Sequence, residues 1–217
     1  MDRIDICLMK EMLLHAADTI IENEPYLTEI DTVIGDGDHG HGMKRGFSVL
    51  KKYLKETETS QIDSLCRETG LELLKSMGGA SGVIFGTMFI GGAGSLPHGT
   101  EASLDQIAEY FVQGEQAIER RGRTKPGQKT MLDALMPAVS ALKISAGNAE
   151  DMGTAFRKAA QAAWEGAQRS RILKGSVGRS KNFKEAAIGL PDPGAVSVSL
   201  IFKAFSETME KVVSNKL

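Results

Sequence analysis

The stretch IDSLCRETGLELLKSM (residues 62–77) decides the fold class, because its apolar residues recur at helical and not at alternating spacing. Moving outward along the chain, the same period recurs in residues 4–21, 43–54, 104–118, 132–142, 155–167 and 200–212, and the continuous apolar run of residues 83–96 is interpreted as a buried helix. Residues 196–200 alternate apolar and polar side chains over too short a range to establish a strand. The sequence therefore predicts about eight helices and no sheet.

Residues that start and stop helices support these boundaries. Glu24-Pro25 is expected to end the first helix, and Ser60 to cap the N-terminus of the third. Ser103 is a candidate N-cap of the fifth helix, and Gly147-Asn148 follows the sixth. The connections favour an all-α fold, an antiparallel, up-and-down bundle. Since there is no repeat, linker or change of composition, we expect one domain over residues 1–217.

Composition and charge exclude several classes of function. The 217 residues carry 26 Lys and Arg against 28 Asp and Glu, and a net charge of −2 argues against a nucleic-acid partner. Hydrophobic residues form 41 % of the chain, so disorder is not expected. Two cysteines and the lack of a secretory segment after Met1 indicate a reduced, cytoplasmic setting. The longest apolar run, residues 83–96, is shorter than the ~18 residues of a membrane span, so no membrane partner is expected.

The segment DTVIGDGDHGHG (residues 31–42) is interpreted as a cation-binding loop. The carboxylates of Asp31, Asp36 and Asp38 repel one another unless a positive charge lies between them, and such ligands suit Mg²⁺ or Ca²⁺. The spacing does not fit an EF-hand. A solvated Asx-Gly turn without a metal is the alternative that this segment alone leaves open. His39 and His41 are better explained as hydrogen-bond donors to phosphate, or as ordinary turn residues, than as metal ligands.

Three other segments are rich in glycine or in positive charge. GGASG (residues 78–82) lets the N–H groups of a helix start face an anion, although close helix packing explains it better when taken alone. GRTKPGQKTM (residues 122–131) is a basic loop, and Gln128 breaks its likeness to a Walker A motif. GRS (residues 178–180) brings another arginine ahead of the PDPG turn (residues 191–194). Together with the aspartates, these segments predict a magnesium–polyphosphate site.

The four segments in this order resemble the nucleotide-binding L subunits of dihydroxyacetone kinases, the DAK2 domain family. The matching stretches are IGDGDHG with MKRGF, GGASG with FGT, PGQKTMLDALMPA, and GRS with IGLPDPGA, over residues 31–195. The resemblance implies an eight-helix barrel that holds ADP or ATP and two Mg²⁺ ions at one end. This sequence departs from the family pattern at His41-Gly42, Val83, Phe85 and Gln128.

The resemblance also implies a set of site residues. The metal ligands would be Asp31, Asp36 and Asp38. The contacts to the nucleotide would be His39, Gly40, His41, Gly42, Ala80, Ser81, Gly122, Met131, Arg179, Asp192, Pro193 and Gly194. No serine–histidine or cysteine–histidine nucleophile pair is evident in the sequence, so no catalytic side chain is assigned.

The function implied by the resemblance is that of a kinase subunit. In the family a separate K subunit holds the ketose, so this chain would be inactive alone. The phosphoryl donor is either free ATP or a phosphohistidine on an M subunit of a phosphotransferase system. Alternatives are another acceptor, as in erythrulose or fatty acid kinases, and a non-catalytic adaptor that docks on a transcriptional regulator. A helical bundle with polar turns and no site is the simplest alternative.

Overall fold

A computed structural model describes residues 2–177, 181 and 184–214, and within these it contains nine α-helices. They are α1 (Ile6–Glu22), α2 (Glu24–Ile34), α3 (Asp38–Glu56), α4 (Ile62–Ser76), α5 (Gly79–Gly92), α6 (Leu104–Gly122), α7 (Leu132–Gly147), α8 (Met152–Arg169) and α9 (Pro193–Ser214). Short 3₁₀ turns are η1 (Ala93–Ser95), η2 (Ser170–Ile172) and η4 (Lys184–Ala187). The all-α prediction is confirmed.

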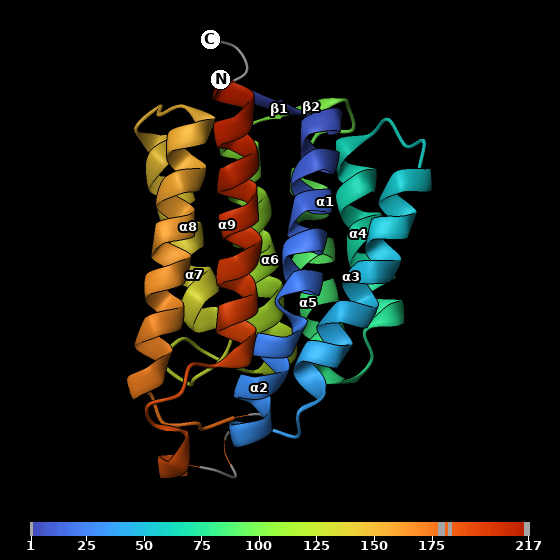
Figure 1. The fold of residues 1–217 in the computed structure, drawn as a ribbon. Helices are drawn as coiled ribbons and strands as arrows, with labels where there is room; N and C mark the ends of the chain where they lie inside the picture. The colour runs from blue at the N-terminus through green and yellow to red at the C-terminus, as the bar shows by residue number, and fades with distance from the viewer. Residues whose placement is uncertain (1, 178–180, 182–183, 215–217) are drawn as a thin grey trace.

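Eight of the helices form an up-and-down barrel around one hydrophobic core (Figure 1). α1 packs on α3, each helix from α3 to α9 packs on the next, and α9 returns to α1. From each helix of the ring to the next the chain reverses, so α3, α5, α7 and α9 begin at the lower end in Figure 1, where α2 also lies. The segments 31–42, 78–82, 122–131 and 191–194, singled out for their glycines and charges, therefore meet at that end.

The structure adds one helix, α2, to the roughly eight that the sequence predicts. Glu24-Pro25 does not simply end a helix, because α1 stops at Glu22 and α2 begins at Glu24 with Pro25 in its first turn. Proline is tolerated there, since the first N–H groups of a helix have no partner within it. α2 extends to Ile34 and so carries Asp31, which the sequence placed in a loop.

The prediction of no sheet also needs a correction. Strands β1 (Arg3–Asp5) and β2 (Glu101–Ser103) pair antiparallel, with Ile4 opposite Ala102 and both side chains fully buried. Three residues are too few for an alternating pattern to be recognised in a sequence. The pair closes the barrel end that lies away from α2 (Figure 1).

The predicted helix caps are confirmed at two of three places. Ser103 and Gln106 form a reciprocal capping box at the start of α6, and Asn148 follows the last residue of α7. Ser60 is not an N-cap; Gln61 holds that position before α4 and makes no side-chain capping bond. None of the described helices combines the length and the apolar composition that a membrane crossing requires.

Helix α6 carries two acidic side chains one turn apart, Glu115 and Glu119, both half-buried. Burial, together with the negative charge of Glu119, raises the pKa of Glu115 from its ordinary value of 4.5 to about 7. The folded state therefore holds this proton more tightly than the unfolded state, and the stability of the fold falls as pH rises from about 4.5 to about 7.

We predict that Glu115→Gln stabilises the protein at pH 8 by roughly 1 to 2 kcal/mol, because it removes the cost of a half-buried charge after allowance for solvent screening. The gain should vanish near pH 4, where the carboxyl is protonated in both states. Urea unfolding across this pH range measures the effect, and Glu109→Gln, an exposed position on the same helix, is the control. A parent protein more stable than Glu115→Gln at pH 8 would contradict the prediction.

Candidate functional site

A cavity of about 560 Å³ opens at the end of the barrel that carries α2. Its volume lies within the range of small-molecule sites. It draws its walls from the α2–α3 junction, the start of α5, the end of α6, the loop before α7 and the start of α9. Thirteen of the fifteen residues that the sequence assigned to the site line it: Asp31, Asp36, Asp38, His39, His41, Gly42, Ala80, Ser81, Gly122, Met131, Asp192, Pro193 and Gly194.

The two other assigned residues have different outcomes. Arg179 lies outside the described residues. Gly40 is buried against α2 and does not line the cavity. A Cβ atom at Gly40 would lie 2.6 Å from the backbone oxygen of Glu24 and 2.6 Å from the backbone nitrogen of Thr28. Gly40 therefore allows the close packing of α2 on α3, a role distinct from direct contact with a ligand.

Asp31 joins α2 to the start of α3. Its Oδ2 accepts the backbone N–H of His39 at 3.0 Å, which satisfies a first-turn donor that the N-cap residue Gly37 has no side chain to bind. A Cβ atom at Gly35 would lie 2.1 Å from Oδ1 of Asp31, so glycine is required there to make room for the carboxylate. Gly37 adopts φ +76°, a left-handed conformation that glycine takes without strain. The glycines of this segment thus place its acidic residues.

Asp31, Asp36 and Asp38 all line the cavity, Asp31 as a buried residue and the other two as exposed ones. They are hard oxygen donors, the class that Mg²⁺ binds. Among the described residues no three side chains of His, Cys, Asp or Glu converge closely enough to enclose a metal by themselves. A Mg²⁺ ion held here would therefore need water or phosphate oxygens in addition to the carboxylates, as is common for Mg²⁺ in proteins.

His39 ties three helices together at the cavity wall. Its Nε2 lies 2.8 Å from Oγ of Ser197 on α9, and its Nδ1 lies 3.2 Å from Oγ of Ser81 on α5. Since the Ser197 hydroxyl donates to the carbonyl of Pro193 at 3.0 Å, its oxygen accepts from Nε2–H of the imidazole. Nδ1 is then the acceptor for the hydroxyl of Ser81. The result is a hydrogen-bonded chain from α5 through α3 to the first turn of α9.

Ser81 and His39 are in contact, but their surroundings are not those of a nucleophile pair. Burial lowers the pKa of His39 to about 4, so the imidazole is neutral near pH 7 and is a weak base. Its other nitrogen faces a serine and not a carboxylate that would orient and strengthen a base. The pair therefore acts as a brace, and a nucleophilic role for Ser81 is disfavoured.

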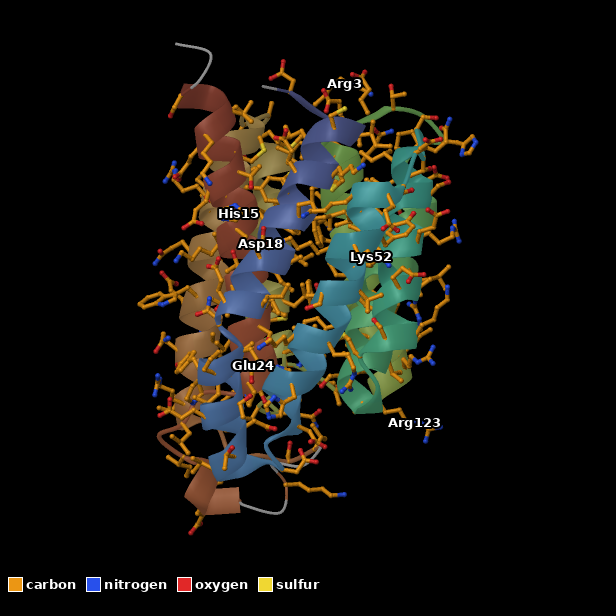
Figure 2. All side chains as sticks on the ribbon, turned by 45° about the vertical axis from the view of Figure 1, so that its right-hand side comes forward. Arg3, His15, Asp18, Glu24, Lys52 and Arg123 are labelled. Atoms are coloured by element: carbon orange, nitrogen blue, oxygen red, sulfur yellow. The ribbon has the colours of Figure 1, made fainter. Side chains whose placement is uncertain are left out.

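His41 lies on the outer edge of the cavity and is mostly exposed. Its Nδ1 is 3.0 Å from Oε1 of Glu24, and Nζ of Lys44 is 3.2 Å from Oε2 of the same carboxylate. Hydrogen bonds from Thr28 and Lys44 hold the pKa of Glu24 below its usual range. Figure 2 shows Glu24 at the barrel end where α2 begins. The histidine that departs from the family pattern is thus part of an ion-pair cluster between α2 and α3.

The inner wall of the cavity is apolar. Ile84 from α5, Ile118 from α6 and Met131 and Leu132 from the start of α7 face it, beside the assigned residue Gly122. Sequence reasoning missed both isoleucines and Leu132, because a side chain that lines a cavity follows the same helical period as one that lies in the core.

Lys129 is not free to bind a phosphate, as its place in the basic loop suggested. Its side chain is almost fully buried, and Nζ donates to the carbonyl oxygens of Ser170 at 2.7 Å and Leu190 at 2.6 Å. It fastens the loop before α7 to the end of α8 and to the segment that leads into α9. Both partners are backbone carbonyl oxygens, and no sequence motif predicts such contacts.

The turn before α9 is fixed by Asp192. Its Oδ2 accepts the backbone N–H of Ala195 at 2.8 Å, and its own N–H donates to the Ser170 hydroxyl at 2.8 Å. Burial raises the pKa of Asp192 to about 7, although the bond from Ala195 acts in the opposite direction. A Cβ atom at Gly194 would lie 3.2 Å from Cβ of Met131. Glycine therefore lets the start of α9 approach the loop before α7.

Comparisons with known proteins agree with this geometry. Residues 33–207 match the family model described as the DAK2 domain. The chain is 36 % identical over 197 residues to the ADP-binding subunit DhaL of a PEP-dependent dihydroxyacetone kinase from Listeria innocua, a match that covers 89 % of this chain and 91 % of the relative. It is 35 % identical over 191 residues to the corresponding Escherichia coli subunit, covering 88 % and 91 % of the two chains.

The fold is similar to that of a solved kinase. The dihydroxyacetone kinase of C. freundii, in a crystal structure with AMP-PNP and Mg²⁺, superposes with a TM-score of 0.74 at 25 % identity. The match covers 94 % of this chain and 34 % of that one, so the chain spans about a third of the larger kinase. By the family model and by its identity to the DhaL subunits, the chain belongs to the DAK2 domain family.

Proposed function

We propose that the chain is the nucleotide-binding subunit of a short-chain ketose kinase and carries ADP or ATP with two Mg²⁺ ions. The observation that carries the proposal is the meeting of thirteen assigned residues, from segments far apart in the sequence, at one cavity of about 560 Å³. The names of the Listeria and Escherichia coli relatives supply the activity and the nucleotide. We place the chain in the cytoplasm, where its two free cysteines remain reduced.

The two sides of the cavity suit the two halves of a nucleotide. The apolar wall that includes Ile84, Ile118 and Met131 fits a purine base, which gains from burial. The edge with the three aspartates suits the phosphates once cations offset the negative charge. Between them lies the start of α5, whose first N–H groups have no partner within the helix and can donate to phosphate oxygens.

Asp31, Asp36 and Asp38 would hold the Mg²⁺ ions. When bound, the cations neutralise charge on the phosphate oxygens during transfer. The chain's own residues supply position: Gly35 leaves room for Asp31, and His39 fixes α3 against α5 and α9. In this account His39 carries no proton between reactants, because it is neutral and both ring nitrogens are already hydrogen-bonded.

The acceptor belongs to another protein. We infer that a K subunit holds the ketose and that this chain is inactive without it, as the word subunit in the names of the relatives suggests. A Lactococcus lactis relative, 29 % identical over 190 residues, is named as PTS-dependent, which supports a phosphohistidine-carrying M subunit as the donor. A D-erythrulose kinase from Mycolicibacterium smegmatis, of which the chain spans 33 % at 31 % identity, keeps erythrulose as a second candidate acceptor.

We predict that Asp36→Ala weakens Mg²⁺-dependent ADP binding at least a hundredfold, because it removes an open carboxylate at the cavity edge. Titration calorimetry with and without Mg²⁺ measures the loss. Asp105→Ala is the matched control, since Asp105 is exposed at the opposite end of the barrel, in the first turn of α6, and should leave binding unchanged. An unchanged ADP affinity in Asp36→Ala would contradict the proposed site.

We predict that the purified chain alone transfers no phosphate to dihydroxyacetone or erythrulose, and that a purified K subunit restores transfer. The assay is product formation with ATP, and with phosphoenolpyruvate plus the phosphotransferase proteins. ADP that stays bound through purification would indicate the phosphoenolpyruvate-dependent route. An empty site that exchanges nucleotide freely would indicate ATP as the donor. Phosphate transfer by the chain alone would contradict the proposal that the ketose is held by a separate K subunit. Nucleotide binding by the complex without turnover of any ketose would favour the adaptor alternative.

A further inference from the structure

Arg45 is a cavity residue that lies in the MKRGF stretch but is not among the fifteen assigned site residues. It lies on α3, seven residues and about 10 Å along the helix axis from Asp38. Its Nε donates to the carbonyl oxygen of Ser76 at 2.9 Å, and its Nη2 donates to that of Met77. These carbonyls end α4, so the guanidinium is held against the turn between α4 and α5.

The bonds to the turn orient the guanidinium and leave part of it available. A guanidinium has five N–H donors, and the two bonds to Ser76 and Met77 use two of them. The side chain is exposed and lines the cavity. Lys129, the other lysine or arginine among the described lining residues, is buried with its ammonium bonded to two carbonyls. Arg45 is thus the exposed one of the two described lysine or arginine side chains that line the cavity, and three of its N–H donors are not used by the turn.

The surroundings of Arg45 suit a phosphate. Three lining carboxylates, those of Asp31, Asp36 and Asp38, give the cavity a negative balance, so a fixed positive charge at its edge has a strong effect on an anionic ligand. A Cβ atom at Gly78 would lie 3.2 Å from Nη2, and glycine there keeps the guanidinium close to the start of α5. The N–H groups of that start and the free guanidinium donors then lie at one edge of the cavity.

We propose that Arg45 binds the outer phosphate of the nucleotide, with its guanidinium oriented for that contact by the carbonyls of Ser76 and Met77. The inference rests on the proposed function and adds to it a residue that discriminates between nucleotides by their phosphates. Planar guanidinium–phosphate contacts are charge-assisted, and a lysine at the same position keeps the charge but not the geometry.

The test compares ADP with adenosine. In Arg45→Gln the Kd for ADP in Mg²⁺ should rise roughly tenfold to a hundredfold, as expected for a lost charge-assisted hydrogen bond, while the Kd for adenosine stays within about twofold. Arg45→Lys should lie between the parent and Arg45→Gln for ADP. Calorimetry measures ADP, and competition against a fluorescent nucleotide measures adenosine.

Lys52→Gln is the matched control, since Lys52 is an exposed cation on the same helix, two turns farther from the cavity end (Figure 2). It should change neither Kd, which separates a contact from a general effect of net charge. Equal losses for ADP and adenosine in Arg45→Gln would assign Arg45 a purely structural role at the end of α4 and overturn the inference. An unchanged ADP affinity would do the same. Failure of the parent protein to bind ADP would instead contradict the proposed function itself.

Discussion

The arrangement of the cavity end depends on one buried, neutral imidazole. His39 stands at the start of α3, accepts the hydroxyl of Ser81 from α5 and donates to Ser197 on α9, while Asp31 binds its backbone N–H. An up-and-down barrel closes its middle with apolar side chains, but helices that surround a cavity lack such contacts at their ends. Hydrogen bonds across the cavity wall replace them and fix the distance between the aspartates and the start of α5.

Charge explains why this end is built from tightly turned glycines and tethered loops. Four carboxylates around one cavity oppose folding unless they are capped, buried with partners or matched by bound cations. Asp31 and Asp192 accept backbone N–H groups, and Lys129 ties the loops beneath them by two carbonyls. Asp36 and Asp38 are exposed and line the same cavity, where carboxylate oxygens suit a cation-bound anion.

The helices of the barrel can be predicted from the sequence because the spacing of apolar residues reflects which side chains are buried. Seven helices of the ring appear as apolar stripes and α5 as a continuous apolar run, and Ser103 is recognisable as an N-cap. α2 is not predicted, because Pro25 is interpreted as the end of a helix, although proline is tolerated in the first turn of one. The strands of residues 3–5 and 101–103 escape because they are too short to show an alternation.

The candidate site is predictable to the extent that local chemistry marks it. Aspartates separated by glycines stand out, and thirteen residues assigned by resemblance do line one cavity. Contacts between segments that are distant in the sequence cannot be predicted in this way. The hydrogen bond between Ser81 and His39 and the burial of Lys129 depend on how the helices pack against one another. Gly40 illustrates the reverse case, since its place in a motif suggests a ligand contact and its surroundings show helix packing.

A crystal structure of the chain grown with ADP and Mg²⁺ tests the central claim most directly. The account predicts the diphosphate and the divalent ions between the carboxylates of Asp31, Asp36 and Asp38 and the start of α5, with the base against Ile84 and Ile118. Nucleotide bound elsewhere on the barrel, or in the cavity with no cation on any of the three aspartates, would contradict it.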